Sequence, residues 1–78
     1  MTWLRELELT ADRLRHLPAA RLAPHEQDFY TLLAGLTDRP VPRLAARAWG
    51  DQLLLIGRDA PEAVDAVREF RRSLDMRL

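Results

Sequence analysis

The chain has no cysteine, so it forms no disulfide, and thiolate chemistry is excluded. Thiolate supplies most ligands of structural zinc sites, and here only His16 and His25 remain as nitrogen ligands. His25 is followed by Glu26 and Asp28, but the second histidine that a helical zinc motif needs is missing. We therefore expect no metal and no cofactor.

Long hydrophobic runs are also absent. The longest aliphatic run is Leu53 to Ile56, far below the roughly 20 residues that a membrane-spanning helix needs. Near the N-terminus, Arg5, Glu6 and Glu8 interrupt the stretch where a signal peptide would be continuously apolar. These features predict a cytoplasmic protein without a membrane segment.

Lysine and asparagine are missing too, and all twelve basic side chains are arginine. Because the missing residue types use AT-rich codons, this bias indicates a GC-rich bacterial genome and is weak evidence for function. The twelve acidic residues cancel the basic ones, so long-range electrostatics select no partner.

The length of 78 residues and a hydrophobic content of 47% are typical of one folded domain that spans residues 1–78. A domain this small buries only about 60% of its unfolded surface. Since neither disulfide nor metal is expected, association with a second chain is the simplest further source of stability.

The first half of the chain predicts two helices. Residues 2–17 carry an apolar helical stripe with Thr2 as a possible cap, and Pro18 ends the segment. A rival interpretation places a short strand before Thr10 and lets Thr10 cap a shorter helix. A connector over residues 18–23 precedes a second helix, which starts at Pro24. Its apolar stripe consists of Phe29, Leu32, Leu33 and Leu36, and residues 37–42 then form a turn.

Residues 41–57 permit two structures. Gly50 and Asp51 suit a type II′ turn, which favours a β-hairpin with strands over residues 43–49 and 52–57. The alternative is a helix whose stripe contains Ala45, Trp49, Leu53 and Ile56, at a cost of about 1 kcal/mol for an internal glycine.

A last helix is expected after residue 59, where Asp59 and Glu62 have the spacing of a capping box around Pro61. Its apolar stripe consists of Ala63, Val67, Phe70 and Leu74. With the hairpin, these helices predict an α+β fold. The alternative is an all-α helical bundle.

No motif of an enzyme is present. The only serine, Ser73, lies among arginines without the turn that activates a nucleophile, and the three glycines do not form a phosphate-binding loop. We therefore expect a protein that is not an enzyme.

The leading functional hypothesis is a protein-interaction module that binds itself, as a homodimer, or another protein. Aromatic residues dominate interface hot spots, and an aliphatic edge strand would pair with a second copy, although tryptophan in a small domain more often belongs to its own core. The candidate interface residues are Trp3, Trp49, Leu53 and Leu55.

The alternative hypothesis is a small nucleic-acid-binding regulator. Its candidate phosphate contacts are Arg13, Arg15 and Arg21, which have only Asp12 as a neutralising neighbour in sequence. The arginines of the last helix are interleaved with Asp65, Glu69 and Asp75 and are therefore weaker candidates.

Overall fold

The first helix, α1 (Trp3–His16), runs without a break through Thr10. In the computed structural model, which describes residues 2–76, the Thr2 hydroxyl accepts a hydrogen bond from the Arg5 N–H at 3.2 Å and caps the helix. The Thr10 hydroxyl donates to the Glu6 carbonyl at 2.9 Å, so it is satisfied inside α1 and caps nothing. The prediction of one helix is confirmed, and the rival strand before Thr10 is wrong.

The segment expected to be a connector is partly helical. It contains α2 (Ala19–Leu22) and a 3₁₀ turn, η1 (Ala23–His25), before α3 (Glu26–Leu36) begins. Pro24 lies in this turn, so the long helix starts two residues later than predicted. On its apolar stripe Phe29 and Leu33 are buried, and the other two leucines are partly buried.

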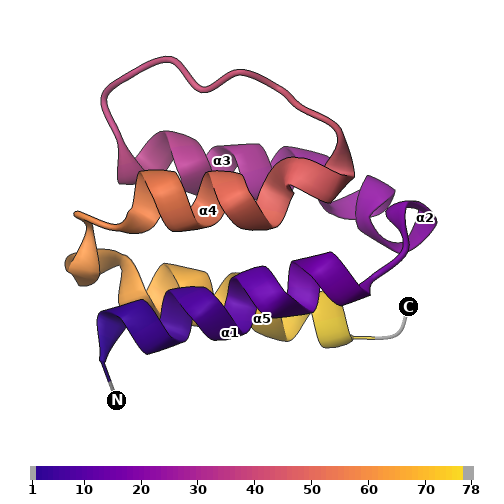
Figure 1. The fold of residues 1–78 in the computed structure, drawn as a ribbon, viewed down its shortest axis with the longest axis horizontal. Helices are drawn as coiled ribbons and strands as arrows, with labels where there is room; N and C mark the ends of the chain where they lie inside the picture. Colours follow the sequence, from indigo (N-terminus) through magenta and orange to yellow (C-terminus); the bar gives the residue numbers. More distant parts are fainter. Residues whose placement is uncertain (1, 77–78) are drawn as a thin grey trace.

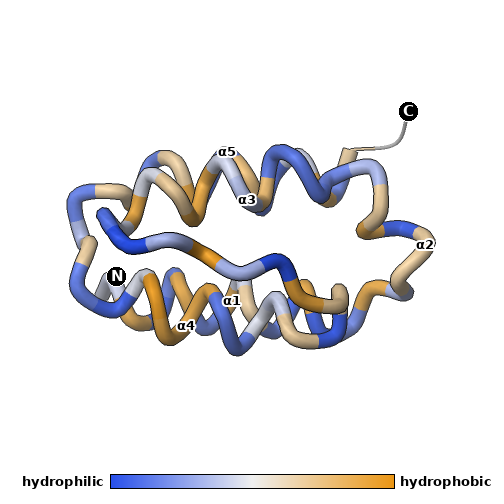
Figure 2. The backbone as a smooth tube through the Cα atoms, turned by 90° about the horizontal axis from the view of Figure 1, so that it is seen from above, coloured by the Kyte–Doolittle hydropathy of each residue, from blue (hydrophilic) through white to orange (hydrophobic). Residues whose placement is uncertain are grey.

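Residues 37–45 form an extended segment without helix, which we call the strap. In Figure 1 it leaves the end of α3 and passes over α3 and α4 to the other end of the molecule. Seen from above in Figure 2, it runs lengthwise between the two rows of helices. The prediction that helix stops after Leu36 is confirmed, but residues 37–42 are part of an extended segment with a bend at residues 38–39 and not a simple turn. The strap covers the seam between α3 and α4.

The predicted β-hairpin is wrong. Residues 46–57 form a 3₁₀ turn, η2 (Ala46–Ala48), that continues into α4 (Trp49–Gly57), and no strand occurs among residues 2–76. The strands over 43–49 and 52–57 are thus replaced by strap and helix. The fold is all-α, the alternative that the sequence left open, and not α+β.

Two residues of α4 are glycine, which has a low helix propensity, and close packing against α1 explains their presence. A Cβ on Gly50 would lie 2.9 Å from the backbone oxygen of Ala11, and one on Gly57 would lie 2.8 Å from Leu7 Cδ2. The absence of a side chain at both positions therefore lets α4 approach α1 closely. A hydrogen bond also joins the start of α1 to the end of α4: Trp3 Nε1 donates to the Gly57 carbonyl at 2.7 Å. Tertiary packing thus offsets the propensity cost of about 1 kcal/mol per internal glycine.

The last helix is α5 (Val64–Asp75), preceded by the 3₁₀ turn η3 (Pro61–Ala63). Its stripe packs as predicted, with Val67, Phe70 and Leu74 buried. The predicted capping box is wrong, because the residues at the starts of η3 and α5 make no side-chain cap. Pro61 and the 3₁₀ turn begin the element instead.

The four longer helices form a bundle in which α1 packs against α4 and α5, and α3 packs against the same two helices. In Figure 1, α1 and α5 run in one direction, and α3 and α4 run in the other. At the centre Trp49 stacks on Phe29 with ring centroids 4.6 Å apart and an interplanar angle of 12°. The core residues are Leu7, Leu14, Leu22, Phe29, Tyr30, Leu33, Trp49, Leu53, Val67, Phe70 and Leu74. In residues 2–76 no helix has the length and apolar character needed to cross a membrane.

Candidate interaction surface

The four candidate interface residues separate into core and surface. Trp49 and Leu53 are 1% and 0% exposed, so they belong to the core of this chain and no partner reaches them. Leu53 was a candidate because of the expected hairpin strand, and Trp49 because of its aromatic ring, whereas α4 turns both side chains inward. Trp3 is partly buried and bonded to Gly57. Of the four, Leu55 alone is largely exposed, at 70%.

The exposure of Leu55 follows from four consecutive aliphatic residues on one helix. Successive helical side chains point about 100° apart, so residues 53–56 cover all directions around α4. Leu53 is fully buried, Leu54 and Ile56 are partly buried, and Leu55 faces outward. In Figure 2 the α4 tube is orange where these residues lie. A helix that is apolar on all sides is normally covered on all sides, and this bundle covers only part of α4.

A short ridge runs along the outer side of α4. We define it as the exposed residues Asp51 and Leu55, the partly buried Leu54, and the exposed C-cap residue Arg58. They are spaced at i, i+3, i+4 and i+7 and therefore lie along one side of the helix. Two leucines thus stand between one acidic and one basic residue, where a solvated helix normally carries polar side chains.

A groove of about 640 Å³ lies beside this ridge, between α4 and the strap. Leu55 and Ile56 line it from α4, and Val41 and Leu44 line it from the strap. Leu44 is itself 47% exposed. The apolar surface of α4 therefore continues onto the strap.

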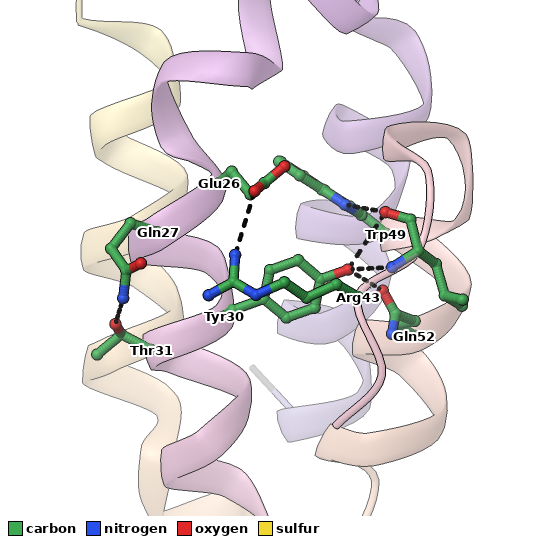
Figure 3. A network of polar contacts seen from close by, with 8 residues as sticks. Glu26, Gln27, Tyr30, Thr31, Arg43, Trp49 and Gln52 are labelled. Carbon is green, nitrogen blue, oxygen red and sulfur yellow. Dashed lines mark hydrogen bonds and ion pairs between the residues drawn. The ribbon is translucent and has the colours of Figure 1, made fainter. Parts of the chain in front are cut away.

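Side chains from α3 and α4 hold the strap in place (Figure 3). The Leu44 N–H donates to the Tyr30 hydroxyl at 2.8 Å, and that hydroxyl donates to Gln52 Oε1 at 2.9 Å. Gln52 Nε2 in turn donates to the Pro42 carbonyl at 2.8 Å. Because strap backbone groups have these side-chain partners, one wall of the groove is fixed without a helix or sheet.

Arg43 adds an ionic contact to the same network. Its guanidinium lies 4.8 Å from the centre of the Tyr30 ring, and its Nη1 lies 3.1 Å from Glu26 Oε2. Both side chains of the ion pair are about half exposed, so the pair contributes little free energy and mainly orients the strap.

Replacing Tyr30 with phenylalanine should loosen the strap while the ring stays in the core. Leu44 N–H and Gln52 Oε1 would lose their shared partner, at a cost of about 1 kcal/mol in the free energy of unfolding. Amide hydrogen exchange read by NMR should show faster exchange at Leu44 with unchanged protection in α1. Unchanged exchange at Leu44 would mean that the hydroxyl does not hold the strap.

A second polar cluster lies where α1 meets α5, and its centre is the buried Glu6, which is 2% exposed. Arg68 Nε donates to Glu6 Oε1 at 3.1 Å, and Arg71 Nη1 lies 2.8 Å from Oε2 as an ion pair without hydrogen-bond alignment. Arg71 also donates to the Thr10 hydroxyl at 3.2 Å. Burial raises the pKa of the Glu6 carboxyl, but Arg71 and Arg68 lower it more, so the net pKa lies below the usual value of 4.5.

This depressed pKa predicts a specific loss of stability in acid. A carboxyl whose folded pKa lies below its unfolded value stabilises the fold above about pH 4.5, and the contribution disappears as the pH falls through the folded value. Urea unfolding of Glu6→Gln should therefore show a large deficit relative to the natural protein at pH 7 and a much smaller one at pH 3. The exposed carboxylate variant Glu62→Gln is the control and should show no such convergence. A deficit for Glu6→Gln that is independent of pH would contradict this prediction.

Two of the three candidate phosphate contacts are paired with carboxylates. Arg13 Nη2 lies 2.6 Å from Asp75 Oδ1, and Arg15 Nη2 lies 2.5 Å from Asp51 Oδ1. Arg21 lies on the next helix, α2. The sequence neighbours of these arginines did not reveal the two carboxylates, because Asp51 and Asp75 approach only in the folded bundle.

Neither histidine lies in a metal-binding arrangement. His16 Nδ1 lies 2.7 Å from the Asp12 carbonyl oxygen, and the His25 ring packs edge-on against Phe70. Over residues 2–76, no cluster of three or more histidine, aspartate or glutamate side chains is placed to hold a metal ion. The surface with a distinct chemical character is therefore the apolar ridge of α4 and its groove.

Sequence reasoning missed two features of this surface and of the core beneath it. The link between Tyr30 and Gln52 joins residues 22 positions apart, and the pairs that Glu6 makes with α5 span more than 60 positions. One signal was present: Thr10 shares the helical face of Trp3, Leu7 and Leu14 on α1, and a polar residue on an apolar face indicates a buried partner.

Comparison with known proteins found no matching family model, curated protein or solved structure.

Proposed function

We propose that this chain is a non-enzymatic protein-interaction module that binds through the outer face of α4. The observation that carries the proposal is Leu55, which is 70% exposed on α4 within a run of four aliphatic residues that point to different sides of the helix. Burial of a leucine side chain contributes roughly 1.5–3 kcal/mol. Association would therefore cover a surface that the bundle leaves open.

Two further observations support protein binding over phosphate binding. The apolar surface continues from α4 to Leu44 and into the groove, which suits a folded or extended polypeptide better than a charged backbone. Two of the three candidate phosphate contacts, Arg13 and Arg15, already lie against carboxylates. A nucleic acid would have to compete with both ion pairs.

Sedimentation velocity over a range from micromolar to about millimolar protein tests the proposal in its simplest form, with the chain as its own partner. The natural protein should sediment faster as its concentration rises. Leu55→Glu should remain monomeric, because association would bury an unpaired charge. Met76→Glu is the matched control, since it also replaces a well-exposed apolar residue, 61% exposed, but lies beyond α5.

Three outcomes are informative. Association that is lost in Leu55→Glu and kept in Met76→Glu supports the proposal. A natural protein that stays monomeric at every concentration contradicts self-association through α4. Equal loss in both variants would mean that surface apolarity in general, and not the face of α4, drives association.

A further inference from the structure

The ridge of α4 has a symmetric arrangement of charge about its two leucines. An acidic residue, Asp51, lies three positions before Leu54, and a basic residue, Arg58, lies three positions after Leu55. Opposite charges therefore stand at equal distances from the midpoint of the leucine pair. A two-fold axis through that midpoint would exchange the two leucines and would place each charge where its opposite had been.

We propose that the partner of this surface is a second copy of the chain, which packs antiparallel to α4 about a two-fold axis between Leu54 and Leu55. The inference rests on the proposed function and specifies its partner and geometry. In this arrangement Leu54 faces Leu55 of the second copy, and Asp51 faces Arg58 of the second copy. Each contact occurs twice, as in any isologous interface.

The charges on the ridge are accessible for these contacts. Arg58 is exposed where α4 ends, and no ion pair joins it to another described residue. The Asp51 side chain is 76% exposed and uses Oδ1 for Arg15, which leaves Oδ2 for a second contact. The formal net charge of zero means that two copies do not repel each other as they approach.

The position of the ridge within the bundle also suits an antiparallel pair. Gly50 and Gly57 face α1, so they take no part in the outer contact, and the side chains that α4 offers outward are the large ones. Antiparallel helices also place the positive end of one helix dipole beside the negative end of the other. A parallel pair would instead bring Asp51 against Asp51 and Arg58 against Arg58, and like charges in contact oppose association.

The charge pattern permits a test by exchange. In Asp51→Arg both ends of the ridge are basic, and in Arg58→Asp both ends are acidic. The dimer dissociation constant of each variant alone should be at least about tenfold higher than that of the natural protein, because every dimer would contain two like-charge contacts. An equimolar mixture should form a heterodimer with nearly natural affinity, since each basic end then meets an acidic end. The double variant Asp51→Arg with Arg58→Asp should also dimerise normally.

Sedimentation equilibrium gives the dissociation constants, and circular dichroism confirms that each variant is folded. Arg15→Gln is the control for the intrachain pair, because it removes the neighbour of Asp51 and leaves the proposed contact intact. Asp65→Arg is the control for net charge, because it makes the same change on α5. Both controls should dimerise like the natural protein.

The results separate the two proposals. Weak single variants with a restored mixture support the antiparallel dimer. Two results would overturn this geometry without contradicting the interaction module. In the first, Leu55→Glu loses association but both charge variants keep natural affinity. In the second, the mixture associates as weakly as its components. A natural protein that never associates overturns the antiparallel dimer and with it self-association through α4.

Discussion

Replacing Trp49 with alanine should remove a large part of the protein's free energy of unfolding at room temperature. Trp49 is 1% exposed and stacks on Phe29, and it also packs against Tyr30 with ring centroids 6.0 Å apart. Truncation of a buried tryptophan costs about 3–5 kcal/mol. The whole free energy of unfolding of a 78-residue domain is roughly 4–12 kcal/mol, so this single cavity removes a large part of it.

Circular dichroism and urea titration would measure this loss. Leu55→Ala is the matched control: it shortens an apolar residue of the same helix but leaves the core intact, and should change stability by less than about 0.5 kcal/mol in the monomer. If Trp49→Ala kept its full helix content and urea midpoint and only its association changed, Trp49 would be an interface residue, contrary to its position in the core.

Replacing Gly50 with alanine should destabilise the protein, although alanine is the better helix former. In an isolated helix the exchange would gain about 1 kcal/mol. Here the new Cβ would lie 2.9 Å from the Ala11 carbonyl oxygen, a backbone atom that moves only if α1 and α4 separate. Overpacking of this kind costs about 1–3 kcal/mol, and the shift reaches every contact between the two helices.

Gly35→Ala provides the control with the opposite sign. Gly35 lies inside α3 and is exposed, and a Cβ added there would meet no atom within 4 Å. Alanine there should raise the free energy of unfolding by about 0.5–1 kcal/mol. Urea midpoints that move in opposite directions for the two variants would support the close approach of α1 and α4. A stabilised Gly50→Ala would show that the two helices are less closely packed than the distance of 2.9 Å implies.

Most of the helical structure follows from local sequence. The apolar stripes of α1, α3 and α5 contain most of the residues that these helices bury, because a period of 3.6 residues selects one face whatever the neighbouring helices are. Pro18 ends the first helix, and the prolines of the strap keep α3 from continuing, because proline lacks an N–H and opposes the helix before it. Short-range signals of this kind act without knowledge of the rest of the chain.

The error at residues 46–57 has a tertiary cause. Gly50 and Asp51 indicate a hairpin turn only if the glycine is there to adopt the positive φ of a type II′ turn. In the structure no described glycine has a positive φ, so that freedom is not used. Gly50 is present because it has no side chain, which matters only once Ala11 lies opposite. Local sequence does not distinguish these two reasons for a glycine.

The candidate surface, too, was predicted from local sequence only in part. That the run Leu53 to Ile56 needs cover on more than one side could be predicted from sequence, since any regular structure directs four adjacent apolar side chains to different sides. The choice of Leu55 as the outward residue depended on the rotation of α4 against α1. The partners of Tyr30, Gln52 and Glu6 depended on which helices became neighbours.

By itself, the amino-acid sequence determined three amphipathic helices, their proline boundaries, a chain without disulfide, and one segment with more apolar surface than a single face can hold. Tertiary structure alone decided that this segment is a helix, that Trp49 and Leu53 point into the core, and that Leu55 points out. The physical reason is the sequence separation over which each kind of interaction acts. Periodicity and proline act over a few residues, whereas the contact of Gly50 with Ala11 and the ion pairs of Glu6 exist only after distant parts of the chain have packed together.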